Sequence, residues 1–240
     1  MAKLAADAVV DTLRATIFDG RLRPGDRLDE TTLVARLDIS RNTLREGFRV
    51  LAHEHLVEHL PNRGVFVRRL TVKEARDVYR TRRLLECGAL RESAQRLAAV
   101  PSLCPAERGA FENEWEVSIS AIRSAVDAGV RARADVDWEA VGTANGRFHL
   151  ALAALAGNDV IDRTLRSLLT EIRLLFLVVA AAQDVHERYL DDNLHVAALV
   201  EAGELVRASI ALEDYLLRAE RHLVGRYAAH FSAEERQRNG

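Results

Sequence analysis

The residues with the clearest chemistry lie in one short stretch, SRNTLREGFRVL, which runs from Ser40 to Leu51. Three arginines recur in it at every fourth position: Arg41, Arg45 and Arg49. Residues four apart share one side of a helix, so their guanidinium groups would form a row. Such groups can bind phosphates, or grip O6 and N7 of a guanine with two hydrogen bonds. The row therefore indicates a surface that faces a negatively charged partner.

The start of the same stretch adds further groups suited to DNA. Ser40, Asn42 and Thr43 carry side chains that can hydrogen-bond phosphates or base edges, and a helix N-terminus itself favours a phosphate. Leu44 and Phe48 occupy the opposite side of the predicted helix and would be buried. We therefore predict that the polar side reads DNA and the apolar side packs on a core.

An ordinary solvated helix is the alternative interpretation of this stretch. In that case the arginines would pair with acids such as Glu46 or Glu54. We favour this alternative for Arg49, which lies late in the helix, and the DNA interpretation for Arg41 and Arg45.

The elements around the stretch decide between these interpretations. A helical pattern precedes it and stops at Gly20, and a short helix that Asp29 could cap comes next. Ser40 is the predicted cap of the arginine helix. Two β-rich segments, LVEHL and GVFVRRL, then flank a turn at Arg63-Gly64. This order predicts a winged helix-turn-helix, with Arg63 and Gly64 at the tip of the wing.

From Thr71 onward the sequence is predicted to be helical almost throughout. Breaks at Pro101/Pro105, Gly157-Asn158, Gln183-Asp184 and Gly203 divide it into roughly six helices with short connections. The fold class is therefore mainly α: an N-terminal winged helix-turn-helix followed by an antiparallel all-α bundle. We predict a DNA-binding domain over residues 1–70, an effector-binding and dimerisation domain over 71–232, and a tail over 233–240.

Composition narrows the class of protein. The 240 residues are 48% hydrophobic and 29% charged, as in globular proteins, and we expect a cytoplasmic protein without a membrane segment. The formal net charge is −2, yet residues 41–69 hold six arginines against three acids, which suits a DNA reader. Cys87 and Cys104 are expected to be packing residues.

Polar residues within the helical half suggest a second site. Asn145 and His149 are four apart in an Ala/Leu-rich segment and therefore share a helix face. Arg82 also lies in a partly apolar segment, and a buried arginine needs a partner. That partner could be the carboxylate of a ligand, or Glu86 four residues further on.

The segment IFDGRLRPGDRLDETTLVARLDISRNTLREGFRVLAHEHLVEHLPNRGVFV resembles the GntR family of bacterial transcription regulators. The resemblance implies DNA contacts by the polar start of the arginine helix and by the wing, that is by Ser40, Arg41, Asn42, Thr43, Arg45, Arg63 and Gly64. Asp38 stands where the family usually has glycine, and aspartate tolerates the left-handed conformation better than most residues. Gly47 replaces a usual alanine, which should weaken the helix by about 1 kcal/mol.

The helical half resembles the FCD ligand-binding domain of FadR-type regulators, through DVYRTRRLLE, NGRFHLALAALAGND and the segment from residue 191 to 223. Many such domains hold a divalent metal of the zinc or nickel class. The matching positions here are Asn145, His149, Asn193 and Tyr215, a poor donor set, although a shifted register would bring in His195. We therefore expect a polar pocket for an organic acid, lined by Arg82, Asn145, His149, Asn193 and Tyr215.

Together these patterns predict a homodimeric transcriptional regulator, in the family's commoner role a repressor, that binds a near-palindromic double-stranded operator. A small carboxylate-type effector in the helical domain would control its DNA affinity. The alternatives are a DNA-binding dimer whose helical domain binds no effector, or a sensor that retains a divalent metal. An enzyme is not expected, because the sequence has no nucleophile elbow, phosphate loop or H-E-x-x-H motif.

Overall fold

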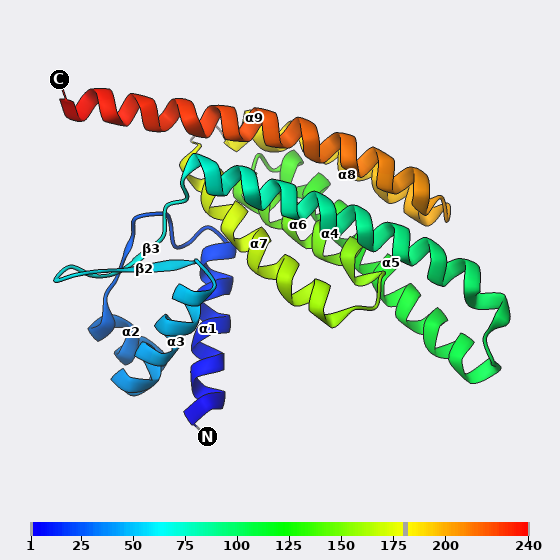
Figure 1. Ribbon diagram of the computed structural model, residues 1–240, viewed down its shortest axis with the longest axis horizontal. Coiled ribbons are helices and arrows are strands. Elements are labelled where there is room, and N and C mark those ends of the chain that lie inside the picture. The colour runs from blue at the N-terminus through cyan, green and yellow to red at the C-terminus, as the bar shows by residue number, and fades with distance from the viewer. Residues whose placement is uncertain (1, 180–181, 240) are drawn as a thin grey trace.

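The computed structural model describes residues 2–179 and 182–239, and side-chain environments for residues 6–179 and 189–231. The chain forms a small N-terminal head and a larger helical bundle that lie side by side (Figure 1). The elements of the head are α1 (Ala2–Phe18), β1 (Arg27–Leu28), α2 (Glu30–Leu37), α3 (Arg41–His53), β2 (Val57–Leu60) and β3 (Gly64–Val67). This is the predicted winged helix-turn-helix.

The wing is a three-stranded antiparallel sheet in the order β1-β3-β2, in which Leu60 pairs with Gly64 across the hairpin. The hairpin was predicted, but the strand β1 was not. Arg27 and Leu28 follow the Pro24-Gly25 turn signal, and they form only a two-residue strand that pairs with Phe66 and Val65. A strand this short carries no periodicity that the sequence could show.

Polar caps fix the ends of α2 and α3. The Asp29 carboxylate accepts a hydrogen bond from the Thr32 amide at 2.8 Å, and this bond lowers the pKa of Asp29. Asp38 ends α2 in the left-handed conformation, with φ of 51°, as expected for an aspartate at a glycine position. Ser40 then caps α3, so the turn between the two helices is set by local hydrogen bonds.

Gly47 lets α1 and α3 approach closely. A Cβ at this position would lie 2.8 Å from Cγ1 of Val9 on α1, which is shorter than a normal contact. The buried face of α3 also presents Leu44, Phe48 and Leu51 to the core, as predicted. Gly47 was expected only to weaken α3, but it also provides the space for this packing.

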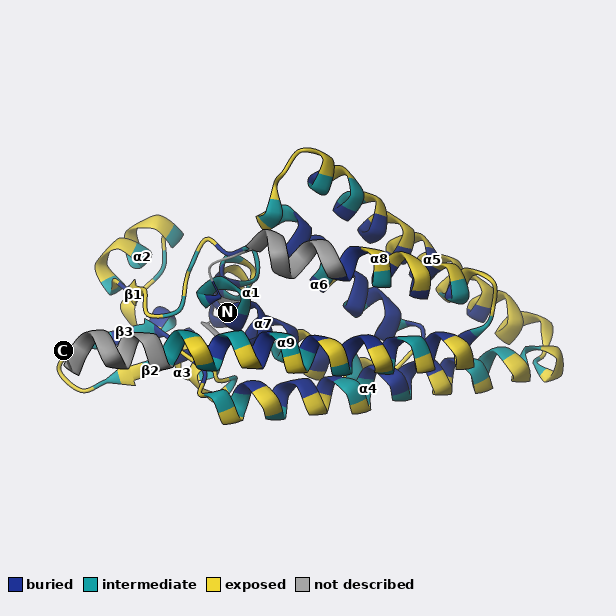
Figure 2. Cartoon of the chain, turned by 90° about the horizontal axis from the view of Figure 1, so that it is seen from above, coloured by how far each residue is buried: buried dark blue, intermediate teal, exposed yellow. Residues whose placement is uncertain are grey.

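The bundle contains six long helices and one short turn of 3-10 helix within the described residues. They are α4 (Val72–Ala99), η1 (Val100–Ser102), α5 (Pro105–Ala134), α6 (Trp138–Ala154), α7 (Asp159–Val178), α8 (Ala182–Glu201) and α9 (Leu205–Asn239). Buried residues turn toward the middle of the bundle along α4 and α9 (Figure 2). None of the described helices is long and apolar enough to span a membrane.

Three details of the bundle differ from the expected breaks. An unpredicted break at Asp135–Asp137 separates α5 from α6; it contains no glycine or proline, and Val136 adopts a φ of 59°. The break expected at Gln183-Asp184 lies earlier, because α8 already begins at Ala182. Residues 233–239, predicted as a tail, continue α9 as helix, in keeping with their Ala, Glu, Gln and Arg content.

Head and bundle meet at the C-terminal end of α1. A Cβ on Gly146 of α6 would clash with the Phe18 ring, so this ring packs directly on the glycine. The Arg173 guanidinium of α7 donates hydrogen bonds of 3.0 Å to the carbonyl oxygens of Phe18 and Glu139. At the linker, the Thr71 capping box begins α4, and the Tyr227 hydroxyl of α9 donates to the Leu70 carbonyl at 2.6 Å.

Two glycines in helix interiors give a test of the α1–α3 packing. Gly47→Ala should destabilise the protein by about 1–3 kcal/mol, because overpacking against Val9 outweighs the gain in helix propensity. Gly88→Ala on α4 is the control: its Cβ meets nothing within 4 Å, so it should stabilise by about 0.5–1 kcal/mol. Urea unfolding measures both, and a stabilising Gly47→Ala would contradict this packing.

Candidate DNA-binding surface and buried polar network

The N-terminal end of α3 presents unpaired polar side chains to solvent. Arg41 and Asn42 are exposed, and neither side chain has a hydrogen bond or ion pair to the residues that the structure describes. The Ser40 hydroxyl accepts from the Thr43 amide at 3.1 Å and lies 2.8 Å from the Thr43 hydroxyl. Ser40 and Thr43 therefore shape the helix start, while Arg41 and Asn42 are free to reach a partner.

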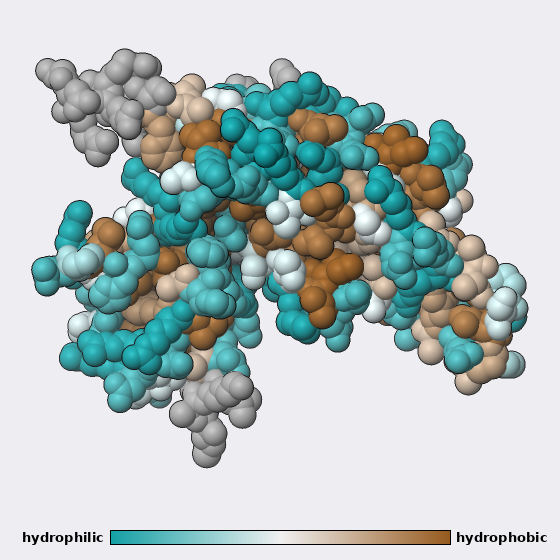
Figure 3. All heavy atoms as spheres, viewed as in Figure 1, coloured by the Kyte–Doolittle hydropathy of each residue, from teal (hydrophilic) through white to brown (hydrophobic). Residues whose placement is uncertain are grey.

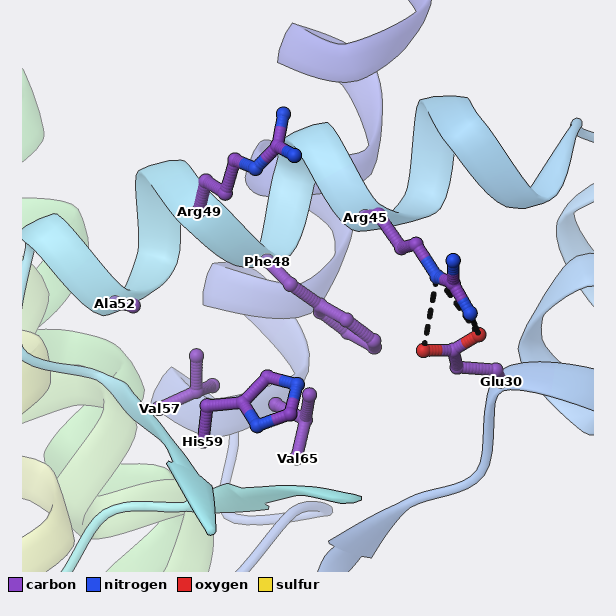
Figure 4. A pocket seen from close by; sticks show the side chains of 8 residues that line it. All are labelled: Glu30, Arg45, Phe48, Arg49, Ala52, Val57, His59 and Val65. Carbon is purple, nitrogen blue, oxygen red and sulfur yellow. Dashed lines mark hydrogen bonds and ion pairs between the residues drawn. The ribbon is translucent and has the colours of Figure 1, made fainter. Parts of the chain in front are cut away.

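Arg45 lies on the same surface but is held by an acid. Its Nε lies 3.2 Å from Oε2 of Glu30, at the start of α2, and both side chains are visible at one end of a groove between α3 and the wing (Figure 4). The Arg45 side chain keeps 60% of its surface exposed, so it can exchange this partner for another anion. The groove has a volume of about 300 Å³, and its lining includes Phe48, Val57 and His59.

Arg49 forms an ion pair with an acid of its own helix, as expected for an ordinary solvated helix surface. It pairs with Glu46 at 2.7 Å on the exposed surface of α3. Glu54 has a different role, because it binds Arg14 of α1 at 2.7 Å. Within the described structure Arg41 thus has no partner, Arg45 forms an exposed ion pair with another helix, and Arg49 forms an ion pair within its own helix.

The wing tip brings the other two predicted residues to the surface. Arg63 is exposed, with its guanidinium carbon 5.7 Å from the centre of the Phe66 ring. Asn62 and Gly64 have φ of 61° and 103°, a geometry that closes the tight turn and suits glycine at the second position. Arg63 and the start of α3 are therefore the exposed polar parts of the predicted reading surface.

The five residues predicted for an effector site come together in the bundle, around the buried carboxylate of Glu86. Oε1 of Glu86 accepts from Arg82 Nε at 2.7 Å, and Oε2 lies 2.6 Å from His149 Nδ1. Nε2 of His149 lies 3.1 Å from the Tyr215 hydroxyl. The chain of contacts thus joins α4, α6 and α9 in the middle of the bundle.

Two amides complete this buried polar network. The Asn193 amide nitrogen donates to Oδ1 of Asn145 at 2.8 Å. The Tyr215 hydroxyl lies 3.1 Å from the same Oδ1 and 3.1 Å from Nε2 of His149, so its single proton can be donated to either atom. Asn193 is 2% exposed, whereas His195, two residues later on α8, is exposed to solvent. Asn193 therefore belongs to the network and His195 does not, since the two side chains point in different directions from the helix.

Burial and charge fix the ionisation of the network. Burial alone would raise the pKa of Glu86, but the Arg82 guanidinium and His149 hold it below its usual range. Burial lowers the pKa of His149, which favours a neutral imidazole that donates from Nδ1 to Glu86. Burial also raises the pKa of Tyr215 well above its usual value, so its hydroxyl stays protonated.

The donor set does not fit a zinc- or nickel-class ion. It offers one imidazole, whose nitrogens both contact other groups, two amides and a phenol that stays protonated. Over the described part of the chain, no group of three or more His, Cys, Asp or Glu side chains has the arrangement of a metal site. The His195 side chain, the ligand of the shifted register, is exposed to solvent and lies outside the network.

The network leaves three buried polar atoms without a hydrogen bond: Nη2 of Arg82, the hydroxyl oxygen of Tyr79 and Oδ1 of Asn193. Tyr79 and Arg82 lie together, with the guanidinium carbon 5.5 Å from the ring centre. Buried groups of this kind are normally satisfied by protein, water or a ligand, so each has capacity for a further partner.

Sequence reasoning missed one acid at these sites, Glu30, and one of the two contacts of another, Glu86. Glu30 lies fifteen positions before Arg45 on another helix, a separation that no helical spacing reveals. Glu86 was considered as a partner of Arg82, but its second bond, to His149 on α6, depends on the packing of α4 against α6. The contacts of Glu30 with Arg45 and of Glu86 with His149 could not be placed without the tertiary structure.

This arrangement defines the class of protein: a winged helix-turn-helix DNA-binding regulator with a helical second domain. The sequence profile described as "Bacterial regulatory proteins, gntR family" matches residues 5–67, and that described as "FCD domain" matches residues 104–218. The chain belongs to the GntR family of transcription regulators, with an FCD domain.

Relatives and solved structures agree with this assignment. The chain is 30% identical over 194 residues to the uncharacterized HTH-type regulator BphR of Paraburkholderia xenovorans, which covers 77% of this chain and 72% of BphR. It is 29% identical over 180 residues to the Nta operon transcriptional regulator of Aminobacter aminovorans, over 74% of this chain and 75% of the relative.

A GntR regulator from Rhodococcus sp. RHA1 superposes on the chain with a TM-score of 0.75 at 35% identity, over 92% of this chain and 97% of the other. Escherichia coli McbR/YncC shares the fold, with a TM-score of 0.73 at 18% identity, over 93% and 98% of the two chains.

Glu30 gives a test of how freely Arg45 can reach DNA. Glu30→Gln should release Arg45 and raise the affinity for a random-sequence duplex by up to about fivefold, as expected for an exposed ion pair of ~0.2–1 kcal/mol. Glu46→Gln is the control, because it removes the same charge from the head but frees Arg49. Fluorescence anisotropy at low salt measures both, and equal gains would show that Arg45 has no special part.

Proposed function

We propose that the chain is a transcriptional repressor that binds a double-stranded operator with α3 and the wing. The observation that carries this proposal is the exposed start of α3. Arg41 and Asn42 have no partner there within the described structure, and Arg45 lies on the same surface of the helix. Such a helix end fits the major groove, where arginine reads guanine. The Ser40 cap, Thr43, Arg63 and Gly64 give that helix and the wing their shape, so the seven predicted residues act as one surface.

Two further points support repression by a dimer. The gluconate operon repressor of Bacillus subtilis is 36% identical over 74 residues, about the length of the head. Regulators with one reading helix in each chain commonly pair two heads on neighbouring half-sites, which produces a near-palindromic operator. A second copy of this chain is thus the partner that we propose, apart from the DNA.

We propose that the buried polar network senses a small organic acid. Arg82, Asn145, His149, Asn193 and Tyr215 supply donors of the kind that bind a carboxylate, and Nη2 of Arg82 is still unsatisfied. Glu86 already places a carboxylate between Arg82 and His149, at 2.7 and 2.6 Å. An acid effector would therefore compete with Glu86, and the competition would change the packing of α4 against α6.

The same contacts favour a second candidate, in which the helical domain binds no effector. Glu86 binds both Arg82 and His149 from within the chain, and both of these side chains are at most 2% exposed. A domain of this kind would serve only to dimerise and to hold the heads.

Glu86→Gln distinguishes the two candidates. It removes the internal carboxylate charge, so Arg82 is left as a buried cation without a charged partner, and the variant should be less stable by about 3–5 kcal/mol. If the network senses acids, benzoate or succinate should raise the melting temperature of the variant more than that of the unmodified protein. Glu220→Gln, which removes the partner of Arg83, is the control. An unchanged melting temperature with both acids supports the effector-blind candidate.

Arginine substitutions test the reading surface. Arg41→Ala and Arg45→Ala should each weaken binding to a selected operator by about 1–3 kcal/mol, and the double variant should lose sequence preference. Arg207→Ala, at the far end of the bundle, should leave affinity unchanged. The measurement is anisotropy on operator and random duplexes at one salt concentration, and intact operator binding by the double variant would contradict the proposal.

A further inference from the structure

A cleft separates the head from the bundle beside the joint at Phe18. It lies between α1 on one side and α6 and α7 on the other, and its volume is about 570 Å³. The space-filling view shows the surface hollowed where head and bundle meet (Figure 3). Volumes of this size are typical of small-molecule sites. The cleft is separate from the buried polar network, because it is lined by Arg147 and Leu150 and not by Asn145 and His149.

The bundle side of the cleft is positively charged and unpaired. Arg147 on α6 and Arg166 on α7 both line it and are exposed. Neither guanidinium makes a hydrogen bond or ion pair with any residue in the described ranges. Asp162, one turn before Arg166, is influenced by its charge but makes no hydrogen bond with it. The two arginines therefore keep their donors available for a ligand.

The acids on the head side of the cleft are paired with arginines of the head. Asp11 pairs with Arg14 at 2.6 Å, and Asp19 pairs with Arg21 at 3.0 Å. Arg14 also binds Glu54, so one arginine is shared by two carboxylates and this wall keeps one excess negative charge. An anion that approaches the opposite wall meets paired carboxylates, whose repulsion is reduced by their partners.

The floor between the two walls is apolar. Ala15 and Phe18 of α1 and Leu150 of α6 line it. The Phe18 ring rests on Gly146, so the floor is formed by the contact that joins head to bundle. Apolar lining with a few convergent polar groups is the usual composition of a ligand pocket.

We propose that this cleft binds an organic anion with an apolar body. The acidic group of the ligand would take hydrogen bonds from Arg147 and Arg166, and its body would cover Phe18 and Leu150. Because the two walls belong to different domains, the ligand binds the docked arrangement of the head better than an undocked one. The site lies outside the network of the proposed function and does not depend on it.

The test uses 2-naphthoate as the probe, a rigid aromatic carboxylate, and 2-naphthamide as its uncharged analogue. Isothermal titration of the full chain should show binding of naphthoate, and at least about tenfold weaker binding of the amide. Arg147→Gln combined with Arg166→Gln should weaken naphthoate binding at least about tenfold as well. Both side chains are exposed, so the double variant should fold normally. Arg131→Gln with Arg221→Gln, two exposed arginines elsewhere on the bundle, is the matched control.

Five outcomes would overturn the proposal. The first is that naphthoate does not bind, and the second is that it binds equally well to the variant that lacks Arg147 and Arg166. Inorganic phosphate that binds as tightly as naphthoate would show that the apolar floor contributes nothing. The double variant could also bind the operator more weakly in the absence of ligand, with a smaller dependence of its affinity on salt concentration. That result would show that Arg147 and Arg166 contact DNA phosphates. Loss of naphthoate binding in Glu86→Gln alone would place the ligand at the network, which keeps the proposed function and removes this one.

Discussion

The bundle is organised around one buried carboxylate, that of Glu86. It binds Arg82 within α4 and His149 on α6, and through Tyr215 and Asn145 the contacts extend to α9 and α8. A buried charge is tolerated only when it is paired and hydrogen-bonded, so these helices must keep the spacing that the contacts require. The same requirement keeps the donors of Arg82 and His149 on a carboxylate of the protein itself.

The fold of the head depends on a different constraint, the amphipathic character of α3. Its buried side packs on α1, where Gly47 admits Val9, and this packing turns the opposite side toward solvent. Phe18 then joins α1 to α6 by its contact with Gly146, next to Asn145 of the network. Helix α1 therefore packs against α3 through Val9 and Gly47, and against α6 through Phe18 and Gly146. These direct contacts connect α3 to the helix that carries Asn145 and His149 of the buried network.

Much of the fold follows from local patterns in the sequence. The caps at Asp29, Ser40 and Thr71, the wing hairpin and the break at Gly157-Asn158 all have short-range causes that the sequence displays. Strand β1 and the break at residues 135–137 were not predicted, because one is two residues long and the other lacks glycine and proline.

The sites were predictable only in part. Spacing placed Asn145 and His149 on one helix face, and the family register placed Asn193 and Tyr215 beside them. The partners that determine what these residues can bind, Glu30 for Arg45 and Glu86 for His149, come from other helices.

Hydrogen–deuterium exchange of the full chain with and without a selected operator would test the central claim, DNA reading by α3 and the wing, most directly. The account predicts new protection at residues 40–45 and 60–64, whereas protection confined to the bundle would contradict it.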